Sequence, residues 1–417
     1  MSSLPGHHRR PDCRLCGSRS LNLVIQLAPT PPANALLRQE QLNDGGEVKY
    51  PLDLFFCNSC THLQLLDVVD PEILFRNYVY VSGTSPVFVE HFRRYRDFLV
   101  ERYAVKSSNL AFEIGSNDGT FLKFFAEKGM AVLGVDPATK IAEAATRSGI
   151  PTLPLFFHDG TAKEIERTHG KAAYILANNV FAHIDDLHSI AQGVERLLAD
   201  DGVFAFEVSY VVDVLDKTLF DTIYHEHLDY HAVGPLIPFL ERHGLELIDA
   251  VRVESHGGSL RGIAQKMDGP RKKSQTVGEL LALEKQKQLD KPETYQAFAR
   301  NVESLGRHLS ERLRALKAQH KHIAAFGAPA KATTLMHQFN IGADSIDFIV
   351  DDSPWKQGLF SPGTHVSIVS SEEIYRRNPD YLVVLAWNFA DSIIQKHKKF
   401  SEQGGHFIVP LPQLKEV

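Results

Sequence analysis

The stretch Glu113–Phe121 (EIGSNDGTF) constrains the fold of this chain more than any other. An apolar run precedes it and a helical pattern follows it, so the order is strand, glycine turn and helix. Gly115 and Gly119 allow the backbone to approach a ligand, and the helix N-terminus offers free N–H groups. A second expected strand, residues 130–136, ends in Asp136, where nucleotide-binding α/β units place an acid on the ribose hydroxyls.

The spacing E-x-G-x-x-x-G followed by an acid fits S-adenosyl-L-methionine (SAM) better than the dinucleotide pattern G-x-G-x-x-G does. No pyrophosphate has to be cradled, and a Glu113 carboxylate suits a ligand that carries an ammonium group. A glycine-rich first turn alone also occurs in other α/β domains. The residues that we expect to bind this cofactor are Glu113, Gly115, Asn117, Gly119, Asp136, Phe157 and Asn178.

Strand-like and helix-like segments alternate around this stretch, which predicts a doubly wound α/β domain. The expected strands lie at residues 109–114, 130–136, 151–156, 173–178, 202–208 and 246–251. Ligands bind outside the carboxyl ends of such strands. Asn178, Asn179 and His183 follow the fourth strand and should therefore face the pocket. A histidine that is merely hydrogen-bonded at a helix N-terminus is the alternative for His183.

Four cysteines, the only ones in the chain, form two C-x-x-C pairs, Cys13/Cys16 and Cys57/Cys60. Four thiolates can hold one tetrahedral Zn²⁺, and a site filled by four cysteines has no open position for a catalytic water. We therefore expect a structural zinc ion. Two disulfides or a redox C-x-x-C are the alternatives, opposed by a reducing cytosol and by the absence of a βαβ context.

Residues 220–231 (FDTIYHEHLDYH) hold three histidines, three acids and two tyrosines, more than a solvated loop needs. A neutral imidazole beside a carboxylate or phenol can transfer protons near neutral pH, so we favour acid/base chemistry here. Metal binding by His225 and His227 is the alternative.

The motifs taken together resemble one family. Two C-x-x-C pairs, Y-x-Y-x-SGTS, EIGSNDG, ANNVFAHI, YHEH, HGGSLR, GAPAK, GTH and AWN follow one another over residues 13–412. In this order they resemble the sugar C-methyltransferases, in particular the SAM-dependent 3-C-methyltransferases of nucleotide-linked 4-keto-6-deoxyhexoses, including the enzyme of the tetronitrose pathway. The resemblance implies an α/β protein with a small N-terminal zinc-binding module (1–76), a central doubly wound SAM-dependent methyltransferase domain (77–270) and a C-terminal Rossmann-like domain (271–417).

The resemblance also implies roles for single residues. By position in YHEH, Tyr224 and His227 match the family's active-site pair, with Glu226 adjacent, while Tyr78 and His183 match residues that line the sugar site. Other candidates for substrate binding are Tyr80, Ser82, Asn179, His225, His256, Lys331 and Asn388.

The C-terminal third repeats the order strand, glycine, helix. Gly327 precedes Lys331, and a further expected strand ends in Asp351, which alone would indicate NAD. The full G-x-G-x-x-G is missing, however, and a lysine at a helix start suits a phosphate. The resemblance favours the diphosphate of a nucleotide sugar. Residues 271–320 are expected to form amphipathic connecting helices.

The implied reaction needs a carbanion, because the methyl group of SAM is an electrophile. A 4-keto group acidifies the hydrogen at C-3, so our hypothesis is that His227 removes this proton and that Tyr224 and Glu226 orient the imidazole. Asn178, Asn179 or His183 would stabilise the enolate oxygen. A zinc-ribbon RNA methyltransferase and a SAM-fold sugar-modifying enzyme without methyl transfer are the alternatives.

Net charge and hydropathy limit the classes of partner that the protein can bind. A net charge of −6 over 417 residues opposes a nucleic-acid partner, which calls for a basic surface. The sequence contains no run of about 18 apolar residues, and no apolar leader follows the basic residues 7–10. We expect a cytoplasmic monomer that binds neither nucleic acid nor a membrane.

Overall fold

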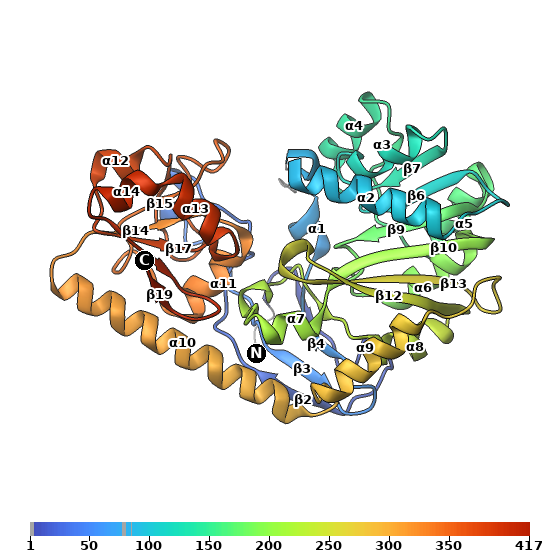
Figure 1. The fold of residues 1–417 in the computed structure, drawn as a ribbon, viewed down its shortest axis with the longest axis horizontal. Coiled ribbons are helices and arrows are strands. Elements are labelled where there is room, and N and C mark those ends of the chain that lie inside the picture. Colours follow the sequence, from blue (N-terminus) through green and yellow to red (C-terminus); the bar gives the residue numbers. More distant parts are fainter. Residues whose placement is uncertain (1–3, 77–80, 85) are drawn as a thin grey trace.

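The computed structural model describes residues 4–76, 81–84 and 86–417, with the backbone alone at Thr84 and His256. A small N-terminal module lies between two larger α/β parts (Figure 1). Buried apolar residues of all three parts join one continuous cluster, from Cys13 to Leu411, so the parts pack together through a shared core.

The N-terminal module is built on antiparallel strands. Strand β1 (His7–Arg9) pairs with β5 (Asp67–Val69), and a second sheet has the order β11-β4-β3-β2. Its strands are β2 (Leu21–Ile25), β3 (Leu54–Cys57), β4 (Leu63–Leu65) and β11 (Asp229–Tyr230). The strand-like residues 48–56 pair continuously only from Leu54, because Pro51 lacks the N–H that a ladder needs. The last strand, β11, comes from the central domain.

The central domain has a seven-stranded sheet of order β12-β13-β10-β9-β6-β7-β8. Strands β6 to β10 are parallel, whereas β13 runs antiparallel to both of its neighbours. The expected third strand is short because Pro154 follows it at once. The strands are β6 (Leu110–Ile114), β7 (Ala131–Val135), β8 (Thr152–Leu153), β9 (Ala172–Asn178), β10 (Leu198–Ser209), β12 (Leu245–Val253) and β13 (Ser259–Lys266).

Helices cover both faces of this sheet. One apolar layer joins the sheet to α2 (Pro86–Arg102) and α3 (Thr120–Ala126), and the opposite layer joins it to α5 (Asp159–His169), α6 (Leu187–Leu197) and α8 (Val233–Glu241). The domain is therefore a three-layer αβα unit. The remaining helical segments up to this point are η1 (Gln39–Asn43), α1 (Pro71–Phe75), η2 (Ser82–Thr84), α4 (Thr139–Arg147), α7 (Val211–Asp216), η3 (Phe220–Thr222) and η4 (Ser255–Gly257).

Two amphipathic helices, α9 (Gln275–Gln286) and α10 (Pro292–Ala318), lead to the C-terminal domain, as expected. Helix α10 runs below the N-terminal module in Figure 1 and contacts β2. The C-terminal sheet has the order β16-β15-β14-β17-β18-β19, parallel except for β19. Its elements are β14 (Ile323–Phe326), α11 (Ala330–Gln338), β15 (Ile349–Val350), β16 (Ile368–Val369), α12 (Glu373–Arg377), β17 (Tyr381–Val384), η5 (Trp387–Phe389), α13 (Ala390–Lys396), α14 (Lys398–Glu402), β18 (His406–Val409) and β19 (Lys415–Glu416).

Among the residues that the structure describes, no helix combines the length and the apolar character needed to cross a bilayer.

Candidate functional site

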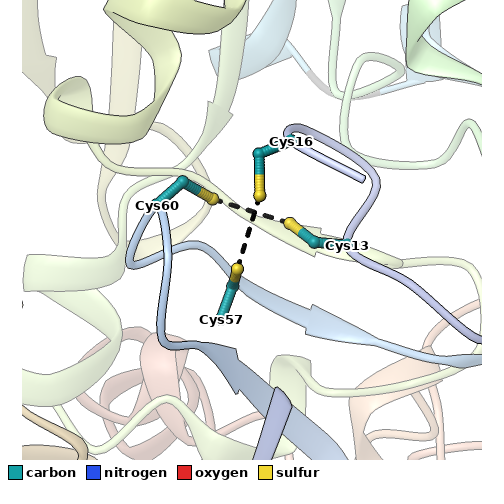
Figure 2. A group of neighbouring side chains, drawn as sticks. All are labelled: Cys13, Cys16, Cys57 and Cys60. Carbon is teal, nitrogen blue, oxygen red and sulfur yellow. Dashed lines mark hydrogen bonds between the residues drawn. The ribbon is translucent and has the colours of Figure 1, made fainter. Parts of the chain in front are cut away.

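The four cysteines converge in the N-terminal module (Figure 2). Their sulfur atoms all lie within 4.8 Å of one another, with 3.6 Å between Cys13 and Cys60 and 3.5 Å between Cys16 and Cys57. A disulfide would need about 2.05 Å. A tetrahedral Zn²⁺ with Zn–S bonds of about 2.3 Å places its sulfurs about 3.8 Å apart. The cysteines therefore fit a Zn²⁺ site.

The acidity of these thiols is consistent with binding of a metal cation. A hydrogen bond with Cys60 lowers the pKa of Cys13 to about 4, and the same contact raises the pKa of Cys60. Zinc would stabilise all four groups as thiolates. Within the described part of the chain, no other group of three or more histidine, cysteine or acidic residues is arranged for a metal, so metal binding by His225 and His227 lacks a third ligand.

The glycine loop (residues 115–119) has the backbone that its sequence predicts. Gly115 and Gly119 have φ of 66° and 76°, which an L side chain rarely adopts. A side chain at Gly115 would collide with Val180, and one at Gly119 would lie 2.7 Å from Ile150. The loop therefore packs directly against the segment that follows β9.

Asp136 holds the glycine loop in place. Its two carboxylate oxygens accept hydrogen bonds from the backbone N–H of Asn117 at 2.9 Å and of Ala138 at 2.8 Å. Asn117 in turn accepts a hydrogen bond from the backbone N–H of Ser82 at 3.0 Å, which joins the loop to η2. Two cofactor candidates, Asn117 and Asp136, and the substrate candidate Ser82 thus meet at one edge of the sheet.

Glu113 and Asn178 lie side by side at the ends of β6 and β9. The Asn178 amide donates to Glu113 Oε1 at 3.3 Å, and burial raises the pKa of Glu113 well above its usual range. Glu113 Oε2 and Asn178 Oδ1 are both buried acceptors without a donor among the described residues. A ligand that carries an ammonium group would supply the missing donors, and SAM has such a group.

Phe157 does not join these residues. Its ring packs 5.3 Å from Phe112, and neighbouring residues of a strand point to opposite faces, so it lies across the sheet from Glu113. The structure places Phe157 in the core because an aromatic ring buries more apolar surface there than at a polar edge.

The histidine segment (residues 220–231) brings the predicted catalytic side chains together. The ring of His227 lies 4.0 Å from the ring of Tyr224 and 4.9 Å from that of His183, and Phe75 stacks on His183 at 5.8 Å. Nδ1 of His227 lies 2.7 Å from the carbonyl oxygen of Thr222. Since a carbonyl can only accept, Nδ1 carries the proton and the lone pair of the neutral ring is on Nε2.

Glu226 has a partner that the sequence did not reveal. Asn34, from the proline-rich loop of the N-terminal module, donates to Glu226 Oε1 at 2.8 Å, and Glu226 is only 3% exposed. The one sequence signal was a polar residue at the end of an otherwise apolar, proline-rich loop. A contact across 192 residues has no local pattern.

Backbone hydrogen bonds join the histidine segment to the β9 loop (residues 179–186). The N–H groups of Leu228 and Asp229 both donate to the carbonyl of Ala182, next to His183, at 2.8 and 3.2 Å. The N–H of Asn179 donates to the carbonyl of Glu207 at 2.8 Å. Since Val180 also touches the glycine loop, the three segments form one site.

Several substrate candidates lie elsewhere. His225 is 1% exposed, its Nε2 lies 3.2 Å from the carbonyl of Tyr50, and burial lowers its pKa to about 4. The Lys331 ammonium lies 3.8 Å from Asp221 and 4.1 Å above the ring of Trp387, while Asn388 is exposed. The predictions at Tyr78 and Tyr80 and for the side chain of His256 fall outside the described residues.

Comparisons with known proteins define the class. The chain matches three family models: "Putative zinc binding domain" over residues 13–75, "Methyltransferase domain" over 89–250 and "C-methyltransferase C-terminal domain" over 254–412. The cysteine cluster, the αβα domain with its glycine loop, and these matches define a SAM-dependent C-methyltransferase with a zinc-binding module.

A relative is similar over nearly the whole chain. The sequence is 37% identical to C-methyltransferase NovU of Streptomyces niveus over 402 residues, which is 96% of each protein. The chain therefore belongs to the C-methyltransferase family that includes NovU. This confirms the family, the α/β class, the SAM cofactor and the zinc-binding module expected from the sequence.

Solved structures are similar to less than half of the chain. A SAM-dependent methyltransferase from Clostridium acetobutylicum is 14% identical with a TM-score of 0.36, and covers 43% of this chain and 92% of that one. Magnesium protoporphyrin IX methyltransferase from Synechocystis, with bound SAH, is 14% identical with a TM-score of 0.33, and covers 43% of this chain and 83% of that one.

Proposed function

We propose that the protein methylates C-3 of a nucleotide-linked 4-keto-6-deoxyhexose, with His227 as the base that forms the enolate. The family supports C-methylation, and the motif order supports this substrate class. The observation that carries the proposal is the hydrogen bond from His227 Nδ1 to the carbonyl of Thr222 at 2.7 Å, which puts the proton of the neutral ring on Nδ1 and makes Nε2 its basic nitrogen.

Side chains around His227 have distinct roles in this proposal. Tyr224, at 4.0 Å between rings, restricts the imidazole to one orientation, and His183 stacks on it at 4.9 Å. Glu226 is held by Asn34, which fixes the backbone of the YHEH turn. The amide of Asn178 or Asn179, or His183, stabilises the negative charge that develops on the 4-keto oxygen.

The bound SAM supplies an electrophilic methyl group. The protein's own contribution is to hold the cofactor at the glycine loop, through Glu113, Asn178 and Asp136, next to the β9 loop that carries His183. Because Gly115 touches Val180 directly, the two ligands share one wall, and holding them side by side lowers the entropic barrier of the transfer.

The C-terminal domain is proposed to hold the nucleotide. Gly327 has a φ of 91° after β14, and the N–H of Ala328 donates to Asp351 at 2.8 Å, which orders a loop at the carboxyl edge of the sheet. Trp355 and Phe389, in the segments that follow β15 and β17, are 89% and 62% exposed. Exposed aromatic rings at such an edge suit stacking on a nucleobase.

The proposed domain limits remain 1–76, 77–270 and 271–417. The matches over 13–75 and 89–250 are consistent with the first two ranges, whereas the third match, over 254–412, begins before the proposed limit at 271.

Hydrogen exchange at C-3 tests the base directly. The protein is incubated in D₂O, without SAM, with a panel of dTDP-, GDP- and CDP-linked 4-keto-6-deoxyhexoses, and deuterium at C-3 is followed by mass spectrometry. For the sugar that exchanges, we expect His227→Asn to slow exchange by roughly 10²- to 10⁴-fold. His188→Asn, a half-buried histidine of α6 outside the site, is the matched control.

Addition of SAM then gives the second readout. A mass gain of one methylene on the same nucleotide sugar is expected from the wild-type protein and from His188→Asn, and not from His227→Asn. Exchange at the wild-type rate in His227→Asn would remove His227 as the base. No methylene gain with any sugar of the panel would overturn the substrate class.

A further inference from the structure

A completely buried arginine lies between the first two zinc ligands. Arg14, between Cys13 and Cys16, is 0% exposed, and such a charge is stable inside a protein only when it is paired and hydrogen-bonded. Its Nη1 donates to the carbonyl of Leu65 and lies 3.4 Å from Gln64 Oε1, while the Arg14 backbone N–H donates to the same Gln64 oxygen at 2.9 Å. These contacts fix the guanidinium within the N-terminal module.

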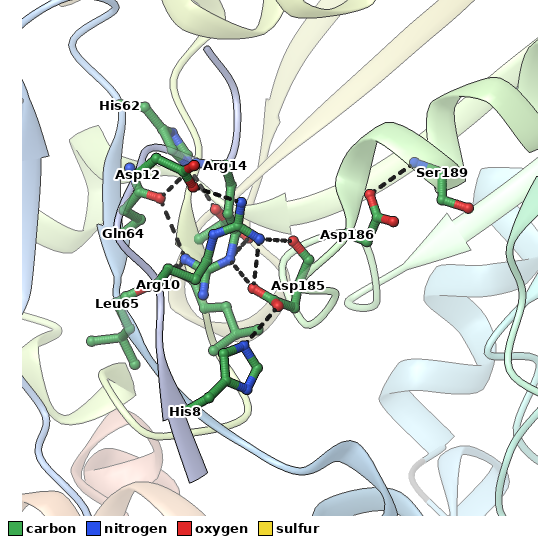
Figure 3. A network of polar contacts seen from close by, with 12 residues as sticks. His8, Arg10, Asp12, Arg14, His62, Gln64, Leu65, Asp185, Asp186 and Ser189 are labelled. Atoms are coloured by element: carbon green, nitrogen blue, oxygen red, sulfur yellow. Dashed lines mark hydrogen bonds and ion pairs between the residues drawn. The ribbon is translucent and has the colours of Figure 1, made fainter. Parts of the chain in front are cut away.

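The same guanidinium reaches both segments of the central domain that carry the proposed catalytic histidines, and Figure 3 shows its contact with Asp185. Arg14 Nε donates to Asp185 Oδ1 at 3.0 Å and lies 4.0 Å from Asp229 Oδ2. Its Nη1 also lies 3.5 Å from the carbonyl of Leu228. Asp185 is two residues beyond His183, and Asp229 is two residues beyond His227. One side chain therefore spans the two segments whose histidine rings stack on each other.

The second cysteine pair reinforces the contact. His62, two residues beyond Cys60, lies 2.7 Å from Asp229 Oδ1, and both side chains are fully buried. Strand β11 pairs with β4, with Asp229 opposite Gln64, and the N–H of Leu65 donates to the carbonyl of Leu228 at 2.8 Å. The end of the histidine segment is thus a strand of the zinc module's own sheet.

Asp185 is surrounded by basic side chains from the N-terminal module. Arg10 Nη1 donates to it at 3.0 Å, and His8 Nε2 lies 3.2 Å away, as Figure 3 shows. Although burial acts to raise it, the charges of Arg14 and Arg10 hold the pKa of Asp185 below its usual range. The carboxylate therefore stays ionised at neutral pH, as a strong pair with Arg14 requires.

We propose that Arg14 is a positioning residue: by holding Asp185, the Leu228 carbonyl and the Asp229 carboxylate, it makes the zinc-binding module set the spacing of His183 and His227. This inference rests on the catalytic role proposed above for the two histidines. The planar fork of arginine can serve a carboxylate and two carbonyls at once, which a lysine cannot. A displacement of about 1 Å at a reacting group can cost on the order of 100-fold in rate, so a small change in this grip should be measurable.

The test compares Arg14→Gln and Asp185→Asn with a matched control, Arg9→Gln. Arg9 forms an arginine–aspartate pair with Asp67 at 2.8 Å in the same module but contacts neither catalytic segment. Zinc per chain, SAM affinity, kcat and KM are measured for each variant, with the nucleotide sugar that the exchange panel identifies. The ring nitrogens of ¹⁵N-labelled histidine are followed by NMR without substrate.

We expect both test variants to keep one zinc and to bind SAM within about twofold of the wild type, while kcat falls roughly 10- to 100-fold with little change in KM. The ring signals of His183 and His227 should shift in both variants and stay unchanged in Arg9→Gln. Arg14→Lys, which keeps the charge but not the fork, should restore only part of kcat.

Unchanged ring signals and an unchanged kcat in Asp185→Asn, with zinc retained, would overturn the proposal. If Arg14→Gln loses zinc, Asp185→Asn decides alone, because Asp185 lies outside the module. The NMR readout needs neither substrate nor turnover. If the ring signals of His183 and His227 do not change in the variants, the positioning role is rejected even if His227 is the base. If His227→Asn exchanges hydrogen at the wild-type rate, His227 is rejected as the base, and the NMR result is unaffected.

Discussion

The two ends of the histidine segment are held by different domains and in different ways. At its start, the C-terminal domain acts through side chains: Lys331 and Trp387 contact Asp221, with the indole N–H donating at 2.6 Å, and Thr334 donates to the carbonyl of Ile223 at 2.8 Å. At its end, the N-terminal module adds a backbone ladder to the side-chain contacts with Asp229, since β11 is a strand of the module's sheet.

Because of this difference, the two domains have different structural roles. A shared sheet fixes the register of the chain, because a slip of one residue would turn every side chain to the other face. The side-chain contacts between α11 and η3 fix only how closely the start of the histidine segment packs against the C-terminal domain. The turn from Tyr224 to His227, which we propose to be catalytic, is therefore aligned by the zinc-binding module and packed against the C-terminal domain.

Removal of zinc should break the backbone-held end with the largest effect. Structural zinc sites contribute about 10 kcal/mol to folding, so treatment with a strong chelator should release β2, β3 and β4 and, with them, β11. Hydrogen–deuterium exchange should show these strands losing protection while β14 and β17 keep theirs, and methyl transfer should fall at least about 100-fold. Equal loss of protection in both sheets would contradict the comparison.

Breaking the side-chain-held end should cost less. Asp221→Asn leaves the largely buried ammonium of Lys331 without its carboxylate, a change that costs about 3–5 kcal/mol in other buried pairs. Denaturant unfolding should show this loss. The double variant Asp221→Asn/Lys331→Met should recover part of the lost stability, because it no longer contains the unpaired charge. A double variant less stable than Asp221→Asn would contradict the pairing.

Acid should weaken the inner contacts of the histidine segment by a smaller amount. Burial lowers the pKa of His225 and of His231 to about 4 in the folded protein, against about 6.5 when unfolded. The unfolded chain therefore takes up protons first, and the stability that is complete above pH 6.5 is lost as the pH falls toward 4. Between pH 7.5 and pH 5 each histidine should contribute a loss of about 2 kcal/mol.

The check is denaturant unfolding at the two pH values, with zinc content measured in the same samples to separate loss of metal. His225→Gln should remove the contribution of His225, so the loss of unfolding free energy that the two histidines cause between pH 7.5 and pH 5 should fall by about half. The same dependence in the variant as in the wild type would show that His225 does not titrate in this range.

The smallest effect is expected at the proposed catalytic turn itself. Asn34→Ala removes the donor to Glu226, and we expect kcat to fall about tenfold, or about 1.4 kcal/mol, with the fold intact. Asn22→Ala, an exposed asparagine of β2 that bonds Asn58, is the matched control and should keep full activity. Steady-state rates of the two variants, measured side by side, decide the point.

Local features of the site could be predicted from the sequence. The turn at Gly115 and Gly119, the acid after β7 and the two C-x-x-C pairs depend on residues close together in the chain, and each has a recognisable spacing. YHEH was identified by its density of titratable groups. The family resemblance added the roles of its members, which spacing alone could not assign.

Contacts across the chain could not be predicted. Arg14 meets Asp185 across 171 residues and β11 joins β4 across about as many, and neither pairing leaves a periodic pattern. His225 could not be distinguished from His227 by composition, although one is buried against Tyr50 and the other faces Tyr224. Strand β13 was also missed, because a glycine-rich loop precedes it and disguises its start.

The late arrival of β11 has a consequence for synthesis in the cell. The first three strands of this sheet, β2, β3 and β4, leave the ribosome long before residues 229–230, so until then β4 presents a bare hydrogen-bonding edge to the surroundings. Zinc bound early would order the two cysteine pairs but could not cover the exposed edge of β4. Nascent chains should thus depend on chaperone shielding for the interval in which about 165 further residues are made.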